Sequence, residues 1–278
     1  MHHPLEIGLL GPMRVLAQGQ PVAVTAPRPQ VILAALAIDV GQPVSSMALA
    51  RYLWTDEPRG DTRRAVATVV TRLRQDLGTD VIRSTDGAYL LAIPAEAVDV
   101  HRFRSLSRAA RSTDGPAELN LLDRALGCWR GEPLQNVSSD ALVAEHAPTL
   151  GEEWYAATQR RVDLLLAAGR HADLVPHLRG LTVRQPLREW LWSRLIVALY
   201  RCGPQAEALQ AYRDVRQLLA DQLGIVPGPE LTATHHAVLN HSFAVAAPAA
   251  VRRARPVTRQ PRVRRLVRLR FRAELRPA

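Results

Sequence analysis

Polar side chains that can hydrogen-bond nucleic acid recur at helical spacing in the segment from Asp61 to Leu77. With successive residues 100° apart on a helix, one stripe of this segment is apolar and comprises Val66, Val70, Leu73 and Leu77. The opposite stripe comprises Arg64, Thr68, Thr71 and Gln75. Arginine pairs with guanine and glutamine with adenine through two hydrogen bonds each, and one helix fits the major groove. The pattern therefore predicts a helix that buries one face in a core and presents the other to DNA.

A hairpin follows this helix and completes the predicted contact surface. Residues 81–84 and 88–93 bracket Thr85-Asp86-Gly87, and an Asp-Gly pair is a strong signal for a tight turn between strands. The hairpin is also compatible with a plain solvent-exposed turn. Arg74 lies nearer the apolar stripe, and its open partners are a phosphate, Asp76 and Glu57. We assign these residues to the surface that faces DNA: Arg63, Arg64, Thr68, Thr71, Arg72, Gln75, Arg83 and Thr85.

Other kinds of functional site find little support in the sequence. All 36 basic residues are arginine, so the chain lacks the lysine that a Walker A loop or Schiff-base catalysis requires. Cys128 and Cys202 belong to no metal-binding spacing, and the last helix carries three histidines without a matching ligand set, namely His235, His236 and His241. Glu152 and Glu153 are neighbours on a helix and point in different directions. We expect no enzyme activity, no cofactor and no metal ion.

The formal net charge of +10 over 278 residues is concentrated at the C-terminal end. Residues 252–278 hold eleven arginines and one acid, Glu274, whereas residues 1–251 carry 25 arginines and 25 acids. Like charges and prolines disfavour a packed core, so we expect residues 245–278 to form a disordered basic tail. Three roles fit this tail: a solvated segment, an arm that holds DNA phosphates, and a surface for anionic lipid.

Short elements around the DNA-contacting helix predict a small domain. Residues 5–24 contain two apolar strands separated by turn signals, and an almost continuously apolar helix follows from about residue 29 to residue 40. Ser46 can cap a second helix, and Asp61 or Thr62 can cap the third, which Gly78 can end. A sheet, three helices and a hairpin indicate an α+β winged helix-turn-helix domain over residues 1–94.

Residues 95–244 are helical in pattern throughout and repeat at a spacing of 34. The matching positions are Val162 and Ile196, Leu165 and Leu199, Gly169 and Gly203, and Ala172 and Ala206. Thirty-four residues is the period of tetratricopeptide helix pairs, which bind peptides or other proteins. We predict two such pairs, at 154–184 and 187–222, with further helices at 100–111, 117–129, 140–150 and 229–240. The second domain is therefore expected to be all-α.

Several motifs resemble those of the Streptomyces antibiotic regulatory proteins of actinomycetes. They lie within residues 5–241 and include EIGLLGPMRV, RRAVATVVTRLRQDLG, DGAYLL, CWRGEPL and AEALQAYRDVRQLLADQLGIVPGPEL. The last is the most specific, because LGIVPGPEL closes a 34-residue helical repeat. The resemblance implies an OmpR-type winged helix over residues 1–94 and a bacterial transcriptional activation domain, which is tetratricopeptide-like, over residues 95–244. The remaining residues, 245–278, are the arginine-rich tail.

The resemblance also implies a function and partners. Such proteins bind direct repeats in double-stranded DNA near promoters of antibiotic and other secondary-metabolite gene clusters, help RNA polymerase holoenzyme to engage, and associate with a second copy on DNA. Ala67 and Thr68 depart from the family pattern, because many relatives have longer polar side chains at these positions. The bases that this chain prefers are therefore left open. The competing interpretation is an adaptor whose repeats bind a partner protein and whose winged helix no longer recognises DNA.

The sequence also suggests where the protein acts. No apolar run approaches the roughly 18 residues of a membrane span, and the first residues lack the features of a leader peptide. We expect a cytoplasmic, nucleoid-associated protein. The first strand begins within a few residues of the N-terminus, and no ATPase module follows the repeats. We therefore expect neither a receiver domain nor control by aspartyl phosphorylation within this chain.

Overall fold

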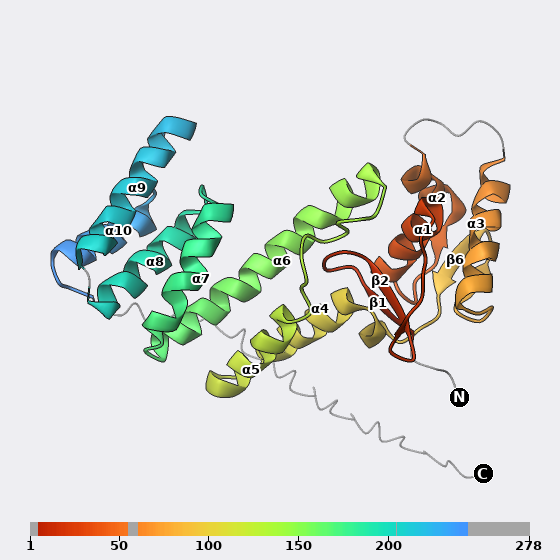
Figure 1. Ribbon diagram of the computed structural model, residues 1–278, viewed down its shortest axis with the longest axis horizontal. Helices are drawn as coiled ribbons and strands as arrows, with labels where there is room; N and C mark the ends of the chain where they lie inside the picture. Colours follow the sequence, from red (N-terminus) through yellow and green to blue (C-terminus); the bar gives the residue numbers. More distant parts are fainter. Residues whose placement is uncertain (1–4, 55–60, 204, 244–278) are drawn as a thin grey trace, which may run out of the picture. The chain divides into compact units, whose positions relative to one another are not determined.

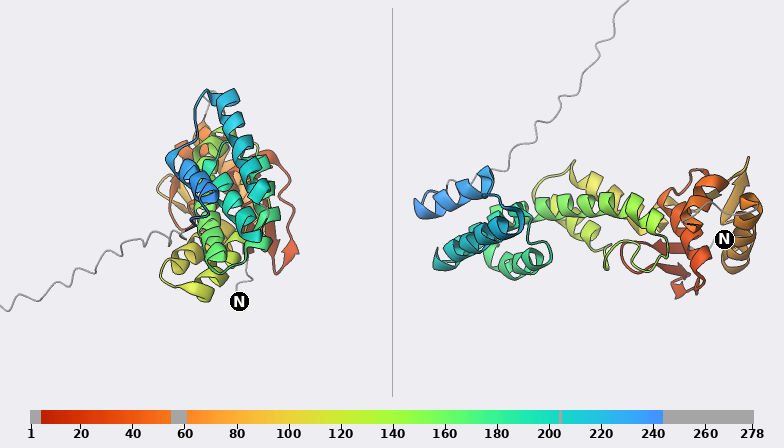
Figure 2. Two further views of the ribbon diagram at one scale, coloured as in Figure 1. Left: turned by 90° about the vertical axis from the view of Figure 1, so that its left-hand side faces the viewer. Right: turned by 90° about the horizontal axis from the view of Figure 1, so that it is seen from above.

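The computed structural model describes residues 5–54, 61–203 and 205–243, and it begins with an α+β region (Figure 1). A first antiparallel sheet has the order β1 (Leu5–Gly8), β2 (Arg14–Ala17), β3 (Gln20–Pro21). Three helices follow, α1 (Pro27–Ile38), α2 (Ser46–Leu53) and α3 (Thr62–Leu77). A second antiparallel sheet has the order β4 (Val44–Ser45), β6 (Ala88–Leu91), β5 (Ile82–Thr85). Figure 1 shows β6 beside α3, and the right-hand view of Figure 2 shows a strand next to the same helix.

The remaining described chain is helical, which confirms the predicted order of an α+β region followed by an all-α region. A short 3-10 turn, η1 (Ala95–Ala97), leads into seven helices within the described residues. They are α4 (Asp99–Ala110), α5 (Gly115–Leu126), α6 (Asp140–Ala167), α7 (His171–Arg184), α8 (Glu189–Cys202), α9 (Gln205–Leu223) and α10 (Pro229–Leu239). The predicted disordered tail, residues 245–278, lies outside the described residues.

The helix pairs follow the 34-residue repeat, with one correction. Gly169 and Gly203 have positive φ angles of 76° and 112°, and they turn the chain from α6 to α7 and from α8 to α9. The prediction of separate helices at 140–150 and from 154 onward is wrong, because α6 runs without a break from Asp140 to Ala167. Pro148 lies on the exposed side of α6, and a single helical glycine such as Gly151 costs only about 1 kcal/mol. Neither residue is enough to end a helix that buries apolar side chains on both sides of them.

The apolar interior forms two clusters that meet within α6. The first extends from Leu5 to Ala157, and it contains the buried faces of α4, α5 and the first half of α6 as well as those of α1 to α3. The second extends from Val162 to Val238. The first cluster therefore continues across residue 94. The domain boundaries at 94/95 and 244/245 remain predictions.

A buried carboxylate joins the first sheet to α4. Asp99, the first residue of α4, is only 1% exposed. Its Oδ1 accepts a hydrogen bond from the Leu9 backbone N–H at 2.7 Å, and its Oδ2 accepts one from the Leu10 N–H at 3.1 Å. The guanidinium Nη2 of Arg130, in the loop after α5, lies 3.1 Å from Oδ2. A parallel bridge between Ile7 and Val98 continues this junction through the backbone.

The same loop holds the turn between β1 and β2 from the other side. The Arg130 N–H donates to the Leu10 carbonyl at 2.7 Å, and the Leu134 N–H donates to the Leu9 carbonyl at 2.8 Å. Gly11, at φ +133°, lies so close to this loop that an added Cβ would come within 3.0 Å of the Gly131 nitrogen. The CWRGEPL motif, which contains Arg130, Gly131 and Leu134, therefore packs directly on the turn of the GLLGP motif.

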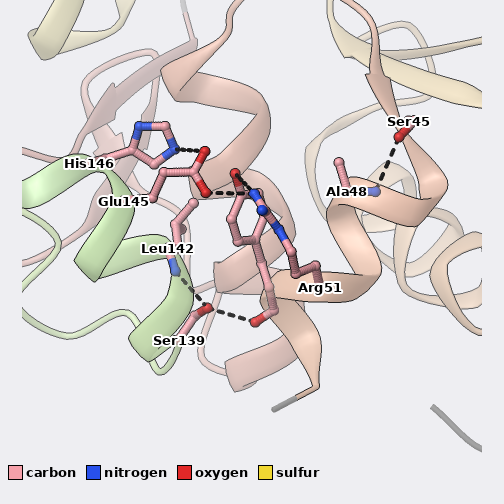
Figure 3. Close-up of polar contacts among 8 residues, drawn as sticks. Ser45, Ala48, Arg51, Ser139, Leu142, Glu145 and His146 are labelled. Carbon is pink, nitrogen blue, oxygen red and sulfur yellow. Dashed lines mark hydrogen bonds and ion pairs between the residues drawn. The ribbon is translucent and has the colours of Figure 1, made fainter. Parts of the chain in front are cut away.

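A second polar junction joins α2 to the start of α6 (Figure 3). The Ser139 hydroxyl donates to the Tyr52 carbonyl at 2.6 Å and accepts from the Leu142 N–H at 3.3 Å, so it caps α6 while bonding to α2. Arg51 Nη2 lies 2.6 Å from Glu145 Oε2. Burial raises the pKa of the Tyr52 phenol, whose oxygen lies 3.3 Å from Arg51 Nη2. The α2 helix is thereby fixed to the helical region at its C-terminal end.

We predict that Asp99→Ala lowers the free energy of unfolding by about 2 to 4 kcal/mol, because it strands two buried N–H groups and the Arg130 guanidinium. Urea unfolding of the full chain, followed by circular dichroism, measures this change. Asp39→Ala removes an exposed aspartate at the end of α1 and is the matched control. Equal reductions in stability for the two variants would contradict the structural role given to Asp99.

Candidate nucleic-acid interface

The α3 helix has the two faces that its sequence predicts. Val66, Val70 and Leu73 are completely buried in the first apolar cluster. Asp61 caps the helix, since its Oδ1 accepts from the Arg64 N–H at 3.1 Å, and Gly78 ends it at φ +107°. Of the two capping residues that the sequence allowed, Asp61 is therefore the one used. The packing of one face against α1 and α2 leaves the other face turned outward.

The structure leaves most of the predicted contact residues accessible. Exposed side chains belong to Arg63, Arg64, Thr68, Thr71, Arg72, Gln75 and Arg83, and that of Thr85 is half-buried. No ion pair within the described parts of the chain involves Arg63, Arg64, Arg72 or Arg83. Four guanidinium groups near α3 are therefore not neutralised by a protein carboxylate in an ion pair there. Contact of these eight residues with DNA stays a prediction.

The two threonines on this face form hydrogen bonds with their own helix. The Thr68 hydroxyl donates to the Arg64 carbonyl at 3.0 Å, and the Thr71 hydroxyl donates to the Ala67 carbonyl at 2.9 Å. Each hydroxyl thus bonds to the carbonyl four residues before it, a common arrangement for threonine in helices. The single hydroxyl hydrogen of each threonine is engaged within the protein.

Arg74 joins α3 to the hairpin, a role that the sequence did not reveal. Its Nε donates to the Ile82 carbonyl at 2.9 Å and its Nη2 donates to the Ser84 hydroxyl at 2.8 Å. Of the partners left open for it, Asp76 forms no ion pair with it in the described structure, and Glu57 lies outside the described residues. The signal available in the sequence was an arginine on the border of the apolar stripe, at the end of the helix nearest the hairpin.

The hairpin tip is held from the opposite side by α2. Thr85 pairs with Ala88, and the turn between them places Asp86 and Gly87 at positive φ angles of 27° and 77°, as an Asp-Gly turn requires. Both the N–H and the hydroxyl of Ser46 donate to the Gly87 carbonyl, at 3.0 and 2.8 Å. The assignment of Ser46 as a helix cap is wrong, because Ser45 accepts from the Ala48 N–H and caps α2.

The rest of the described chain is expected to hold neither a metal site nor a pair of converging glutamates. Within it, no cluster of histidine, cysteine or acidic residues could hold a metal ion, and no helix is long and apolar enough to cross a membrane. Glu152 pairs with Arg188, whereas Glu153 pairs with Arg104 on α4. The two glutamates therefore diverge, as their adjacent positions on a helix predict.

Comparison with known proteins gives one family match and several relatives. The model of the family "Bacterial transcriptional activator domain" matches residues 98–239. The chain is 38% identical to the regulatory protein AfsR of Streptomyces coelicolor, over 87% of this chain and 25% of AfsR. It is 30% identical to the regulatory protein DnrI of Streptomyces peucetius, over 84% of this chain and 92% of DnrI. The transcriptional regulator RedD of Streptomyces coelicolor is 30% identical, over 89% of this chain and 74% of RedD.

A solved structure matches the fold of both regions. It is Mycobacterium tuberculosis EmbR in complex with a low-affinity phosphopeptide, which superimposes with a TM-score of 0.80 at 33% sequence identity. The superposition covers 86% of this chain and 66% of the EmbR chain. The chain spans about a quarter of the length of the AfsR proteins that it matches.

We predict that Arg74→Ala weakens DNA binding without changing how binding depends on salt, because two nitrogens of its guanidinium are bonded to the hairpin and position it. Arg63→Ala is the matched control, since removal of one arginine–phosphate pair lowers the slope of log affinity against log salt by about 0.9. Fluorescence anisotropy with a labelled duplex at several salt concentrations measures both slopes. A drop in slope for Arg74→Ala equal to that for Arg63→Ala would show that Arg74 contacts a phosphate instead.

Proposed function

We propose a function for this chain from one premise: the chain belongs to the Streptomyces antibiotic regulatory protein family of transcriptional regulators. The activator-domain match covers about half of the chain, and DnrI is matched over nearly its whole length. The family resemblance inferred from the sequence motifs is thereby confirmed, as is the expectation of a regulator and not an enzyme. The target DNA and the partners of this chain are proposals.

The chain acts as a sequence-specific DNA-binding activator, with α3 placed in the major groove. The observation that carries this proposal is the outward face of α3. A polar stripe runs along this face from Arg64 to Gln75, and no large apolar side chain interrupts it. Arg72 lies beside this stripe and suits a base contact, whereas Arg63 and Arg83 suit phosphate contacts; none of the three forms an ion pair in the described structure. The hairpin residues Arg83 and Thr85 contact the adjacent DNA backbone.

The helical region acts as the partner-binding part of the protein. Three large apolar side chains are exposed within four residues at and just after the end of α9, namely Leu223, Ile225 and Val226. Side chains of this kind support contact with other proteins. We assign to this region the contact with RNA polymerase holoenzyme and the association of two copies on direct repeats, spaced by one turn of the duplex or a multiple of it.

The genes under control are those of an antibiotic or other secondary-metabolite cluster. The relatives AfsR, DnrI and RedD come from Streptomyces, and their similarity to this chain supports the assignment. The protein works in the cytoplasm on the nucleoid. Residues 252–278, with eleven arginines and one acid, act as an arm that binds DNA phosphates irrespective of sequence.

We predict that Arg72→Ala lowers affinity for the selected site by about 1 to 3 kcal/mol, because Arg72 contacts a base, with a smaller effect on random DNA. The site comes from unbiased selection among random duplexes, and mobility shift measures binding to both DNAs. Arg170→Ala, an exposed arginine on the helical region, is the matched control. No sequence preference in the selection would favour the adaptor interpretation over the proposed function.

We also predict that a chain ending at Ala244 binds DNA with a smaller salt slope than the full chain. Residues up to 244 form one compact unit, so the shortened protein is expected to fold. Every phosphate that the arm neutralises adds about 0.9 to the slope, and removal of the arm takes this amount away. An unchanged slope would show that the arm does not hold phosphates. Replacing Glu274 in the full chain is the control for a small change in tail charge.

A further inference from the structure

We propose that Thr68 and Thr71 recognise thymine through their methyl groups, so that the bound site carries thymines at the positions facing the middle of α3. This inference rests on the proposed function, because it requires α3 to lie in the major groove. Thymine alone among the four bases carries a methyl group on its major-groove edge, and a threonine methyl is a suitable apolar partner for it.

The hydroxyl groups of Thr68 and Thr71 are both engaged within α3. Each bonds to a backbone carbonyl four residues earlier, at 3.0 Å for Thr68 and 2.9 Å for Thr71. A hydroxyl has one hydrogen, so neither side chain can donate a hydrogen bond to a base without giving up this bond. Donation to guanine O6, to N7 of a purine or to thymine O4 is therefore disfavoured for both residues.

The methyl groups of both threonines are held in fixed positions. The β-carbon of threonine carries a hydroxyl and a methyl, so a hydroxyl held at the helix carbonyl fixes χ1 and holds the methyl in one position. Both side chains are solvent-exposed and lie one turn apart on the same face. Ala67 lies next to them and is half-buried. The middle of the contact face thus presents small apolar groups that are already fixed before DNA binds.

The middle of the contact face differs from its ends in the length and polarity of its side chains. Arg64 lies one turn before Thr68, and Gln75 lies one turn after Thr71. The long hydrogen-bonding side chains therefore flank the threonines and suit a purine on either side, whereas the short apolar groups suit thymine methyls between them. The threonine oxygens keep lone pairs and can still accept a hydrogen bond from adenine or cytosine. The experiment must distinguish this acceptor role from methyl contact.

The experiment replaces thymines of the selected site one at a time with deoxyuridine, which lacks only the 5-methyl group. At one or two positions facing α3, affinity is expected to fall about three- to fivefold, the effect of exposing one methyl group. Thymines outside the protected region serve as the control and leave affinity unchanged. The affinities are measured by anisotropy with the full chain at one salt concentration.

Matched protein variants identify the threonine responsible. Thr68→Ser keeps the hydroxyl and removes the methyl, whereas Thr68→Val keeps the methyl and removes the hydroxyl; the same pair is made at Thr71. The serine variants are expected to bind thymine sites about three- to fivefold more weakly. Each serine variant is also expected to be indifferent to deoxyuridine at its own position, because it has no methyl group to contact the base. The valine variants are expected to retain both affinity and sensitivity to deoxyuridine.

The outcomes separate this inference from the proposed function. Weaker binding by the valine variants, with full affinity in the serine variants, would assign the contact to the hydroxyl and overturn methyl recognition. Deoxyuridine without effect at every position, in a site with clear sequence preference, would overturn it too while leaving the proposed function intact. Absence of any preferred site in the selection would overturn both. Circular dichroism of all four variants, unchanged from the parent, confirms that α3 stays folded.

Discussion

The arrangement of the N-terminal α+β region depends on the buried carboxylate of Asp99. Two consecutive backbone N–H groups converge on it from a turn about 90 residues earlier, and a guanidinium reaches it from the loop after α5. A buried charge is costly unless it is neutralised and hydrogen-bonded, and here all three donors belong to other segments. These polar groups are therefore hydrogen-bonded only when three segments pack against one another: the first sheet, the start of α4 and the loop that carries Arg130.

These junctions hold the proposed DNA-contacting surface in place. The α2 helix is bonded at one end to the Gly87 carbonyl of the hairpin and at the other to Ser139 and Glu145 of the helical region. Arg74 closes the remaining side, since it joins α3 to the strand that begins at Ile82. Contact residues on helices and strands that are fixed in this way lose little conformational entropy on binding. A partner that displaces the start of α6 would also alter the support of α2.

Local features could be predicted from the sequence, and long-range polar contacts could not. The buried stripe through Val66 and Val70, the Asp-Gly turn and the helical repeat follow from periodicity and turn chemistry, which act over a few residues. The bonds of Asp99 and Arg74 depend on segments that only the folded chain brings together. The unbroken α6 was missed for a different reason: Pro148 and Gly151 are local signals for a break, and burial on both sides of them outweighs those signals.

The arginines named here fall into two groups: some form an ion pair with a carboxylate, and others do not. In the helical region, arginines such as Arg160 and Arg194 pair with acids on other helices and hold the repeat together. Around α3, Arg63, Arg64 and Arg72 have no such pairing among the described residues. Since the charge over residues 1–251 balances, the proposed attraction of this part of the chain to DNA depends on where the acids are placed and not on their number. The unpaired arginines around α3 thus keep a local positive charge that suits phosphates, whereas the paired arginines of the helical region are neutralised by acids.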